Sequence, residues 1–152
     1  MNAEKSILVI NGPNLNKLGS RELNIYGEQT LEDIRLSLSS LASLETIDLI
    51  FCQSNSESEI IDEIHEAEQK GVKGILINAA AFTHTSIAIR DALLTLSNVF
   101  IVEVHLSNIF KREKFRHQSY ISDISDAVIA GMGSQGYEYG FKFIMGKING
   151  ST

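Results

Sequence analysis

The chain contains little cysteine, proline or tryptophan: it has one cysteine, one proline and no tryptophan among its 152 residues. A single cysteine, Cys52, cannot form a disulfide framework within the chain, so a reducing compartment is expected. The first residues carry no apolar signal segment, and no apolar run approaches the ~20 residues that a membrane-spanning helix needs. The sequence therefore predicts a cytoplasmic protein without a membrane partner.

Basic residues are not in excess either. The chain has 13 lysines and arginines against 19 aspartates and glutamates, and its formal net charge is −6. An acidic balance argues against nucleic acid as the main partner. The length and an apolar content of 43% predict a single domain over residues 1–152 that can bury a sizeable core.

Short apolar runs alternate with segments of helical periodicity. Strands are expected at residues 6–10, 47–52, 75–77, 99–104 and 127–130. Helices are expected from residue 30, from residue 56 to Gly71, over 86–96 and over about 137–147, with capping boxes at Thr30–Asp33 and, more cleanly, at Ser56–Glu59. The alternation predicts an α/β fold, a flavodoxin-like three-layer sandwich with a five-stranded parallel sheet in the order 2-1-3-4-5.

Two segments, the loop after the first strand and the helix expected at residues 86–96, have apolar residues beyond those that a simple connection or a surface helix needs. Residues 11–29 form a long loop whose apolar residues (Leu15, Leu18, Leu23, Ile25) indicate ordered packing. In the expected helix 86–96, one apolar stripe should cover the sheet; it consists of Ala88, Ile89, Ala92, Leu93 and Leu96. Ile87 and Leu94 would then face outward beside Asp91, either as part of a subunit contact or as scattered surface aliphatics.

Several familiar site patterns are missing or incomplete. Residues 131–136 match the dinucleotide-binding pattern G-x-G-x-x-G, but the chain ends before the further strand and acidic residue that this site needs, so a tight, closely packed turn is predicted. His84 and His105 lack a third ligand at suitable spacing, which predicts no metal site. No G-x-S-x-G nucleophile elbow is present.

Polar residues instead gather where the predicted strands end. Because ligands bind beyond the carboxyl ends of parallel strands, these side chains should share one crevice. They are Asn11, Arg21, Tyr26, Asn78, His84, Glu103, His105, Arg112 and Arg116.

This set suits proton abstraction beside a carbonyl group with loss of water. Arg21 near Tyr26 would stabilise a phenolate and make the tyrosine a general base. His105, two residues from Glu103 and on the same side of the strand, would be a general acid oriented by the carboxylate. Asn78 could polarise an oxyanion, and the arginines favour a small, anionic, polyhydroxylated substrate.

Five blocks of sequence resemble type II 3-dehydroquinate dehydratases and together span nearly the whole chain: Asn11–Gly27, Asn78–Asp91, Glu103–Asn108, Arg112–Tyr120 and Gly131–Tyr137. The chain departs from the family pattern at Lys17, at Leu23 and at Ala79-Ala80, where Pro-Gly or Pro-Ala is common. None of these departures removes a functional group.

The resemblance implies anti elimination of water from 3-dehydroquinate through an enolate, in the shikimate pathway, without metal, cofactor or Schiff base. It makes Tyr26 the base, His105 the acid and Arg21 the residue that tunes the tyrosine. The expected substrate-binding residues are Asn11, Asn78, His84, Asp91, Leu106, Ser107, Arg112 and Arg116, with the backbone N–H groups of Leu106 and Ser107 holding the carboxylate.

The resemblance also implies a homododecamer, a tetramer of trimers, in which Asp91 reaches the site of a neighbouring subunit. The alternative that the residues leave open is a non-enzymatic sensor of small anions on the same fold. Such a sensor would bind a quinate-like acid without turnover.

Overall fold

The computed structural model describes residues 5–20 and 22–150, and of Tyr26 only the backbone. The strands are β1 (Ser6–Asn11), β2 (Asp48–Gln53), β3 (Val72–Asn78), β4 (Phe100–His105) and β5 (Ala127–Ala130). The helices are α1 (Leu23–Tyr26), α2 (Leu31–Leu44), α3 (Glu57–Gln69), α4 (Ile87–Leu94) and α5 (Gln135–Ile148). The strands form one parallel sheet in the order β2-β1-β3-β4-β5, which confirms the predicted topology.

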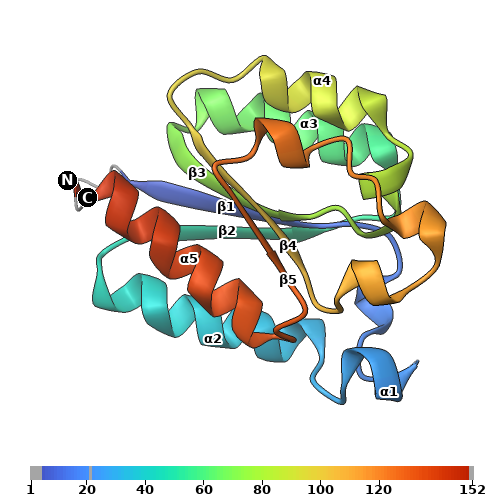
Figure 1. Ribbon diagram of the computed structural model, residues 1–152. Helices are drawn as coiled ribbons and strands as arrows, with labels where there is room; N and C mark the ends of the chain where they lie inside the picture. Colours follow the sequence, from blue (N-terminus) through green and yellow to red (C-terminus); the bar gives the residue numbers. More distant parts are fainter. Residues whose placement is uncertain (1–4, 21, 151–152) are drawn as a thin grey trace.

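Successive side chains of each strand point to opposite faces of the sheet, and this places apolar residues in two layers. Ile7 and Val9 of β1 face the layer beneath α2 and α5, whereas Leu8 and Ile10 face the layer beneath α3 and α4. The two helix pairs cover opposite faces of the sheet (Figure 1). All four of these side chains are at most 1% exposed, as expected for a parallel sheet covered on both sides.

The helix caps follow the predicted positions but differ in detail. Thr30 and Asp33 form the full reciprocal capping box. The box expected at Ser56–Glu59 is one-sided: the Ser56 hydroxyl accepts from the Glu59 N–H, but the Glu59 carboxylate binds the Ser54 hydroxyl at 2.5 Å instead. Ser54 in turn accepts from the Ser56 N–H, so it takes over the role that was predicted for the Glu59 side chain.

Three of the five residues predicted for the α4 stripe are buried on the helix, and a fourth, Leu96, packs partly buried against the same core just beyond the helix end. The buried residues of this helix are Ile89, Ala92 and Leu93, and the Ser86 hydroxyl caps its start. Ala88 is exposed, so its predicted burial is wrong. At 100° per residue, Ala88 lies about 90° from the centre of the buried stripe, and its small side chain loses little by facing water.

The long first loop is packed only in its first half. Leu15 and Leu18 are 5% exposed, as predicted for an ordered loop. Leu23 and Ile25 are 48% and 37% exposed, and they lie on the short helix α1, which the sequence did not predict. A single helical turn on the surface leaves these side chains without a core to cover.

The glycine-rich segment after β5 forms the predicted tight turn. Gly131 and Gly133 have φ angles of 90° and 62°, which favour glycine. A Cβ atom at Gly136 would lie 3.2 Å from Ile129 Cγ2 and 3.3 Å from Val104 Cγ2, so α5 begins in close contact with β4 and β5. The motif therefore serves packing.

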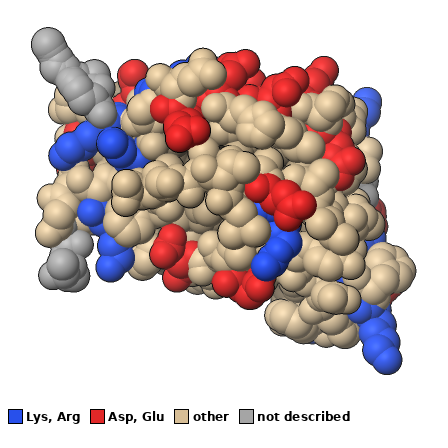
Figure 2. Space-filling view, turned by 90° about the horizontal axis from the view of Figure 1, so that it is seen from above, with Lys and Arg blue, Asp and Glu red and all other residues tan. Residues whose placement is uncertain are grey.

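Charged side chains of both signs are spread over the face that α3 and α4 form (Figure 2). Within the described ranges, no helix has both the length and the apolar character needed to cross a membrane.

Candidate active site

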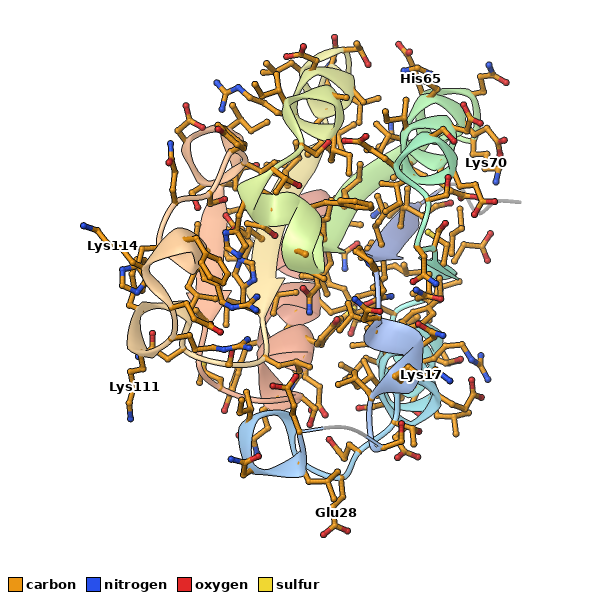
Figure 3. The ribbon with its side chains drawn as sticks, turned by 90° about the vertical axis from the view of Figure 1, so that its right-hand side faces the viewer. Lys17, Glu28, His65, Lys70, Lys111 and Lys114 are labelled. Atoms are coloured by element: carbon orange, nitrogen blue, oxygen red, sulfur yellow. The ribbon has the colours of Figure 1, made fainter. Side chains whose placement is uncertain are left out.

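A cavity of about 110 Å³ opens at the carboxyl ends of β1, β3 and β4, the edge of the sheet seen in Figure 3. Its walls come from the loops that follow these three strands. The lining residues are Pro13, Asn14, Leu15, Asn78, Ala80, Ala81, His84, His105, Leu106, Ser107, Ile109, Arg112 and Arg116. The crevice predicted from the strand ends is therefore present, and it holds most of the predicted binding residues.

A close backbone contact joins the first two loops. The Gly12 N–H donates to the Asn78 carbonyl oxygen at 2.8 Å. A Cβ atom at position 12 would lie only 2.3 Å from the carbonyl oxygen of Ala79, so only glycine allows this approach. The loop after β1 is thereby held against the end of β3, where it forms one wall of the cavity.

Glu103 and His105 form a buried pair at the end of β4. The distance between His105 Nε2 and Glu103 Oε2 is 2.5 Å, and the two side chains are 5% and 0% exposed. The carboxylate accepts, so Nε2 carries a proton and Nδ1 is the nitrogen left for other partners. The same-side placement predicted from the strand period is confirmed.

Two serines that sequence reasoning missed complete the surroundings of Glu103. Ser119 donates to Oε2 at 3.0 Å, and Ser122 donates to Oε1 at 2.5 Å. Burial alone would raise the pKa of Glu103, but the hydrogen bonds and charge of His105 and the two serine hydroxyls hold it below its usual value. Glu103 is therefore a carboxylate near neutral pH. The sequence indicates only that a buried carboxylate at position 103 needs hydrogen-bond donors, and it does not indicate which residues supply them.

His84 lies beside His105 with its ring nearly parallel, at a centroid distance of 6.4 Å and an interplanar angle of 17°. Its Nδ1 lies 2.8 Å from the Gln118 carbonyl oxygen, which can only accept, so Nδ1 carries the proton. Burial lowers the pKa of His84, and the ring is neutral at pH 7. Neutral His84 thus offers Nε2 as a hydrogen-bond acceptor in the cavity wall.

Asn78 belongs to a buried hydrogen-bonded chain. Its Oδ1 accepts from the Ala80 N–H at 3.1 Å, and its Nδ2 donates to the Tyr137 hydroxyl at 3.0 Å. The hydroxyl donates to Asn11 Oδ1 at 2.6 Å, and Asn11 Nδ2 donates to the Cys52 carbonyl at 2.9 Å. Asn11 is fully buried and does not line the cavity, so the structure places it behind the wall in which it was expected.

Arg112 and Arg116 bring positive charge to the mouth of the cavity. Arg112 Nη1 donates to the Ser107 hydroxyl at 3.3 Å, and its side chain is 13% exposed. Arg116 Nε donates to Glu113 Oε1 at 2.6 Å, and this hydrogen bond helps to hold the pKa of Glu113 below its usual range. Both guanidinium groups are therefore held by neighbouring side chains close to the space that an anion would enter.

The other basic residues of this loop have a different orientation. Lys111 and Lys114 point away from the body of the protein (Figure 3), and neither lines the cavity. The loop after β4 thus separates its charges, with arginines inward and lysines outward. A planar guanidinium suits bidentate binding of a carboxylate better than an ammonium group does.

Besides Asn11 and Glu103, which are buried and do not line it, three predicted site residues are not placed in this cavity. Arg21 lies outside the described residues, and the backbone of Tyr26 ends α1 while its side chain is not described. Asp91 is exposed on α4 and does not line the cavity. Conversely, Pro13, Asn14 and Ile109 line it without having been singled out in the sequence.

Among the described residues, no group of three or more histidine, cysteine, aspartate or glutamate side chains could hold a metal ion. Cys52 lies on the edge strand β2, where burial raises the pKa of its thiol to about 12, so the thiol is not reactive near neutral pH.

Comparisons with known proteins give relatives over almost the whole chain. A 3-dehydroquinate dehydratase from Hahella chejuensis is 54% identical over 145 residues, which are 95% of this chain and 98% of that protein. A 3-dehydroquinate dehydratase from Polynucleobacter necessarius is 56% identical over 138 residues, 91% of this chain and 92% of that protein.

Solved structures similar to this chain belong to the same kind of enzyme as these relatives. The crystal structure of the type II dehydroquinase from Butyrivibrio crossotus superposes with a TM-score of 0.90 at 44% identity, over 93% of this chain and 97% of that one. The family model described as Dehydroquinase class II matches residues 5–145. The cavity at the strand ends, the sheet order and these matches agree, and the chain belongs to the class II dehydroquinase family.

Proposed function

We propose that the chain is a 3-dehydroquinate dehydratase, a hydro-lyase that converts 3-dehydroquinate into 3-dehydroshikimate and water. The observation that carries the proposal is the buried Glu103–His105 pair, which opens on a cavity with two arginines at its mouth. A general acid beside an anion-binding site is what the loss of a hydroxyl group from a small carboxylic acid requires. The names of the relatives support the same substrate.

In the proposed first step, the Tyr26 phenolate removes a proton from the carbon next to the ketone. The electron pair moves on to the carbonyl oxygen and gives an enolate, which the Asn78 amide stabilises by donating a hydrogen bond. Arg21 lowers the free energy of the phenolate by its positive charge. The roles of Tyr26 and Arg21 rest on the resemblance of residues 11–27 to the family.

In the proposed second step, the enolate re-forms its carbonyl group and the carbon–oxygen bond to the β-hydroxyl breaks. Protonated His105 gives its proton to the departing oxygen, which leaves as water. The two steps together make up the elimination, and its anti course is what the resemblance to the family implies. The Glu103 carboxylate keeps the imidazole in position and compensates its positive charge until the transfer.

Binding of the substrate uses the remaining walls. The backbone N–H groups of Leu106 and Ser107, together with Arg112, are proposed to hold the carboxylate. Neutral His84 accepts a hydrogen bond from a ring hydroxyl through Nε2, and Arg116 adds positive charge at the mouth. No step in this scheme calls on a metal or an organic cofactor.

The direct test is the absorbance of the conjugated enone product. Purified protein mixed with 3-dehydroquinate should produce it, whereas Tyr26→Phe should lower kcat by ~10²–10⁴ because only the proton acceptor is lost. Binding of a substrate analogue should persist in this variant. Binding by the wild-type chain without any turnover would instead show an anion sensor and contradict the proposal.

We also propose that the subunits assemble into a homododecamer, a tetramer of trimers, with Asp91 completing a neighbour's site. Ile87 and Leu94, which are 56% and 54% exposed, flank Asp91 on the outward side of α4, and the exposed Ala88 widens this face. Complete burial of such aliphatic side chains stabilises a contact by ~1.5–3 kcal/mol each. The chain would work as one domain in the cytoplasm, within the shikimate pathway.

Subunit mixing tests the shared site. Asp91→Asn and Tyr26→Phe proteins, each inactive alone, should recover activity after joint dissociation and reassembly, because some mixed interfaces pair an intact Asp91 with an intact Tyr26. If confirmed hybrids regain nothing, Asp91 acts within its own chain.

A further inference from the structure

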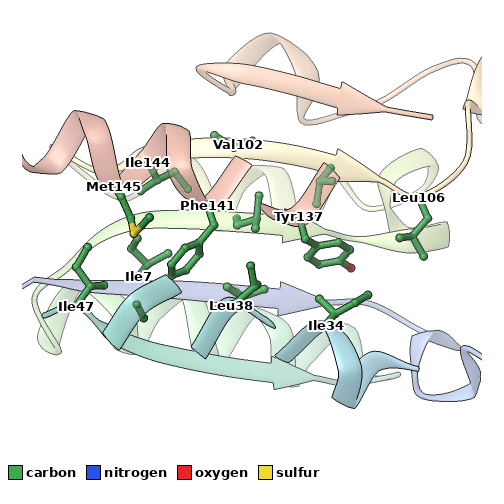
Figure 4. Packing of buried hydrophobic residues seen from close by; sticks show 14 of the residues in the cluster. Ile7, Ile34, Leu38, Ile47, Val102, Leu106, Tyr137, Phe141, Ile144 and Met145 are labelled. Atoms are coloured by element: carbon green, nitrogen blue, oxygen red, sulfur yellow. The ribbon is translucent and has the colours of Figure 1, made fainter. Parts of the chain in front are cut away.

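The Glu103 carboxylate is buried in a layer that is otherwise apolar. Its neighbour Val102 belongs to the core beneath α2 and α5 (Figure 4). Because successive side chains of a strand alternate, Glu103 and His105 point to the opposite layer, beneath α3 and α4. The register partners of Glu103 on β3 and β5 are Ile77 and Val128, so neither position brings a charge. The behaviour of this carboxylate therefore depends on its hydrogen-bond partners.

The two oxygens of the carboxylate have different partners. Oε2 accepts from His105 Nε2 at 2.5 Å and from the Ser119 hydroxyl at 3.0 Å. Among the described residues, the hydrogen bond to Oε1 comes from the Ser122 hydroxyl alone, at 2.5 Å. Ser122 does not line the cavity, so its hydroxyl acts on the site only through Glu103.

The segment that carries Ser122 is held in place by contacts other than this hydrogen bond. Ile121 is 1% exposed in the core beneath α3 and α4, and the Tyr120 N–H donates to the Thr83 carbonyl at 3.0 Å. The Ser122 N–H donates to the Ser119 hydroxyl at 3.1 Å. Loss of the Ser122 hydroxyl should thus leave the backbone where it is and change only the surroundings of the carboxylate.

We propose that Ser122 is a positioning residue that sets how firmly the Glu103–His105 pair holds the proton that it gives to the leaving hydroxyl group. Beside a neutral imidazole, the carboxylate carries an uncompensated negative charge. A hydroxyl donor stabilises that state more than it stabilises the ion pair with protonated His105. Ser122 therefore makes the pair release its proton more easily. The inference rests on the proposed function, because it takes His105 as the acid of that reaction.

Other ionisable groups around the pair do not change with the serine hydroxyl. His84 lies beside His105 and is neutral at pH 7. Arg112 and Arg116 line the same cavity, and their positive charges oppose an extra proton on His105 whether or not the hydroxyl is present. A change in pH dependence on removal of the hydroxyl can therefore be assigned to Glu103.

The test is Ser122→Ala, followed through the pH dependence of kcat. The alkaline limb of this profile, where the acid has lost its proton, should move up by about 0.5–1 pH unit, because the pair holds the proton more firmly. A weaker acid should also lower kcat on the plateau by about two- to threefold. KM should change little, since Ser122 does not line the cavity. Glu103→Gln removes the charge itself and should move the same limb down.

Ser125→Ala is the matched control. The Ser125 hydroxyl lies on the same segment, but it donates to the Ile121 carbonyl, a neutral acceptor, at 2.7 Å. Its removal deletes the same atom and should leave the profile in place. Ser122→Thr keeps the hydroxyl and should retain the wild-type profile. Should Ser122→Ala fail to fold, Ser122→Cys replaces it, and its weak S–H donor should give a smaller upward move.

A double-mutant cycle and NMR separate this inference from the proposed function. In a Glu103→Gln background, Ser122→Ala should move the limb no further, because the charge on which the hydroxyl acts is gone. Without substrate, the midpoint of the His105 ring signals in an NMR pH titration should lie higher in Ser122→Ala than in the wild type.

The outcomes have different meanings. An inactive wild-type protein would contradict the proposed function, and the NMR titration would still report on the pair. In an active protein, the role of Ser122 would be overturned by a limb and a ring midpoint that stay in place or move down in Ser122→Ala. An equal move in Ser125→Ala, or a full further move in the Glu103→Gln background, would overturn it as well.

Discussion

Replacing Glu103 by glutamine tests the acid half of the proposed reaction with the least change of shape. The carboxylate lies 2.5 Å from His105 Nε2 and accepts from Ser119 and Ser122. The side-chain oxygen of the new glutamine can still accept from His105 and Ser119, and the Ser122 hydroxyl can rotate to accept from the new amide. The substitution therefore removes the negative charge while keeping the hydrogen bonds satisfied.

The size of the effect follows from the hydrogen bond that changes. A hydrogen bond to a charged group contributes about 1.5–3 kcal/mol and one between neutral groups about 0.5–1.5 kcal/mol, so the protonated state of His105 loses about 1–2 kcal/mol. At 1.36 kcal/mol per tenfold change, kcat should fall by about 5- to 30-fold. His105→Ala removes the acid itself and should lower kcat by ~10²–10⁴.

Initial rates from the absorbance of the enone product, measured over a range of substrate concentrations, give kcat and KM separately. Glu103→Gln should lower kcat with little change in KM, because the carboxylate does not line the cavity. Glu66→Gln makes the same chemical change in an exposed ion pair with Lys70 on α3 and should leave both constants unchanged. If Glu103→Gln keeps kcat within twofold, or if only KM rises, the carboxylate does not support a proton donor and the reasoning fails.

Three further predictions concern stability and reactivity. Ala80 has a left-handed φ of 53°, a conformation that disfavours residues with a side chain by ~1–2 kcal/mol. Glycine in its place would lose ~0.5–1 kcal/mol in backbone entropy on folding. Ala80→Gly should therefore raise the free energy of unfolding in urea by up to ~1 kcal/mol, and a destabilised variant would contradict this. Burial lowers the pKa of His84 below 6.5, so the contribution of this side chain to stability should be complete above pH ~6.5 and be lost as the pH falls. Between pH ~7.5 and ~5.5, the free energy of unfolding should therefore decline less in His84→Gln than in the wild type. Equal slopes in the two proteins would refute the lowered pKa. Since the pKa of Cys52 is about 12, iodoacetamide at pH ~8 should modify the native thiol at least ~10²-fold more slowly than the denatured one, as mass spectrometry would show.

The sequence predicted the sheet well because the patterns that specify it are local. Each strand is a short apolar run, and right-handed crossovers leave few ways to order the strands. The bounds of β5 agree with the prediction residue for residue, and the other strands shift by one to three residues at an end. The pairing of Glu103 with His105 was also predictable, because it depends only on the two-residue period of β4.

The partners of individual polar side chains could not be predicted in this way. The Ser56 N–H was expected to donate to the Glu59 carboxylate, but it donates to the Ser54 hydroxyl, which in turn donates to Glu59. The spacing of the residues does not decide which of several nearby acceptors this N–H binds. Asn11 ends a strand at the rim, where a ligand contact is a natural expectation, but its amide is engaged by Cys52 and Tyr137 on other elements. The partners of a buried polar group follow from three-dimensional packing, and the linear pattern gives only the need for them.

The contact between Asn11 and Tyr137 joins residues 126 positions apart, the end of the first strand and the beginning of the last helix. During synthesis, β1 to β4 and every described residue that lines the cavity leave the ribosome before α5 does. At ~5–20 residues per second, the synthesis of α5 is completed about 1–4 s after that of β5. Until α5 docks, Asn78 Nδ2 and Asn11 Oδ1 both lack the Tyr137 hydroxyl that joins them. The last helix thus completes the hydrogen-bonded chain behind the cavity wall, and these two bonds can form only after the whole fold has been synthesised.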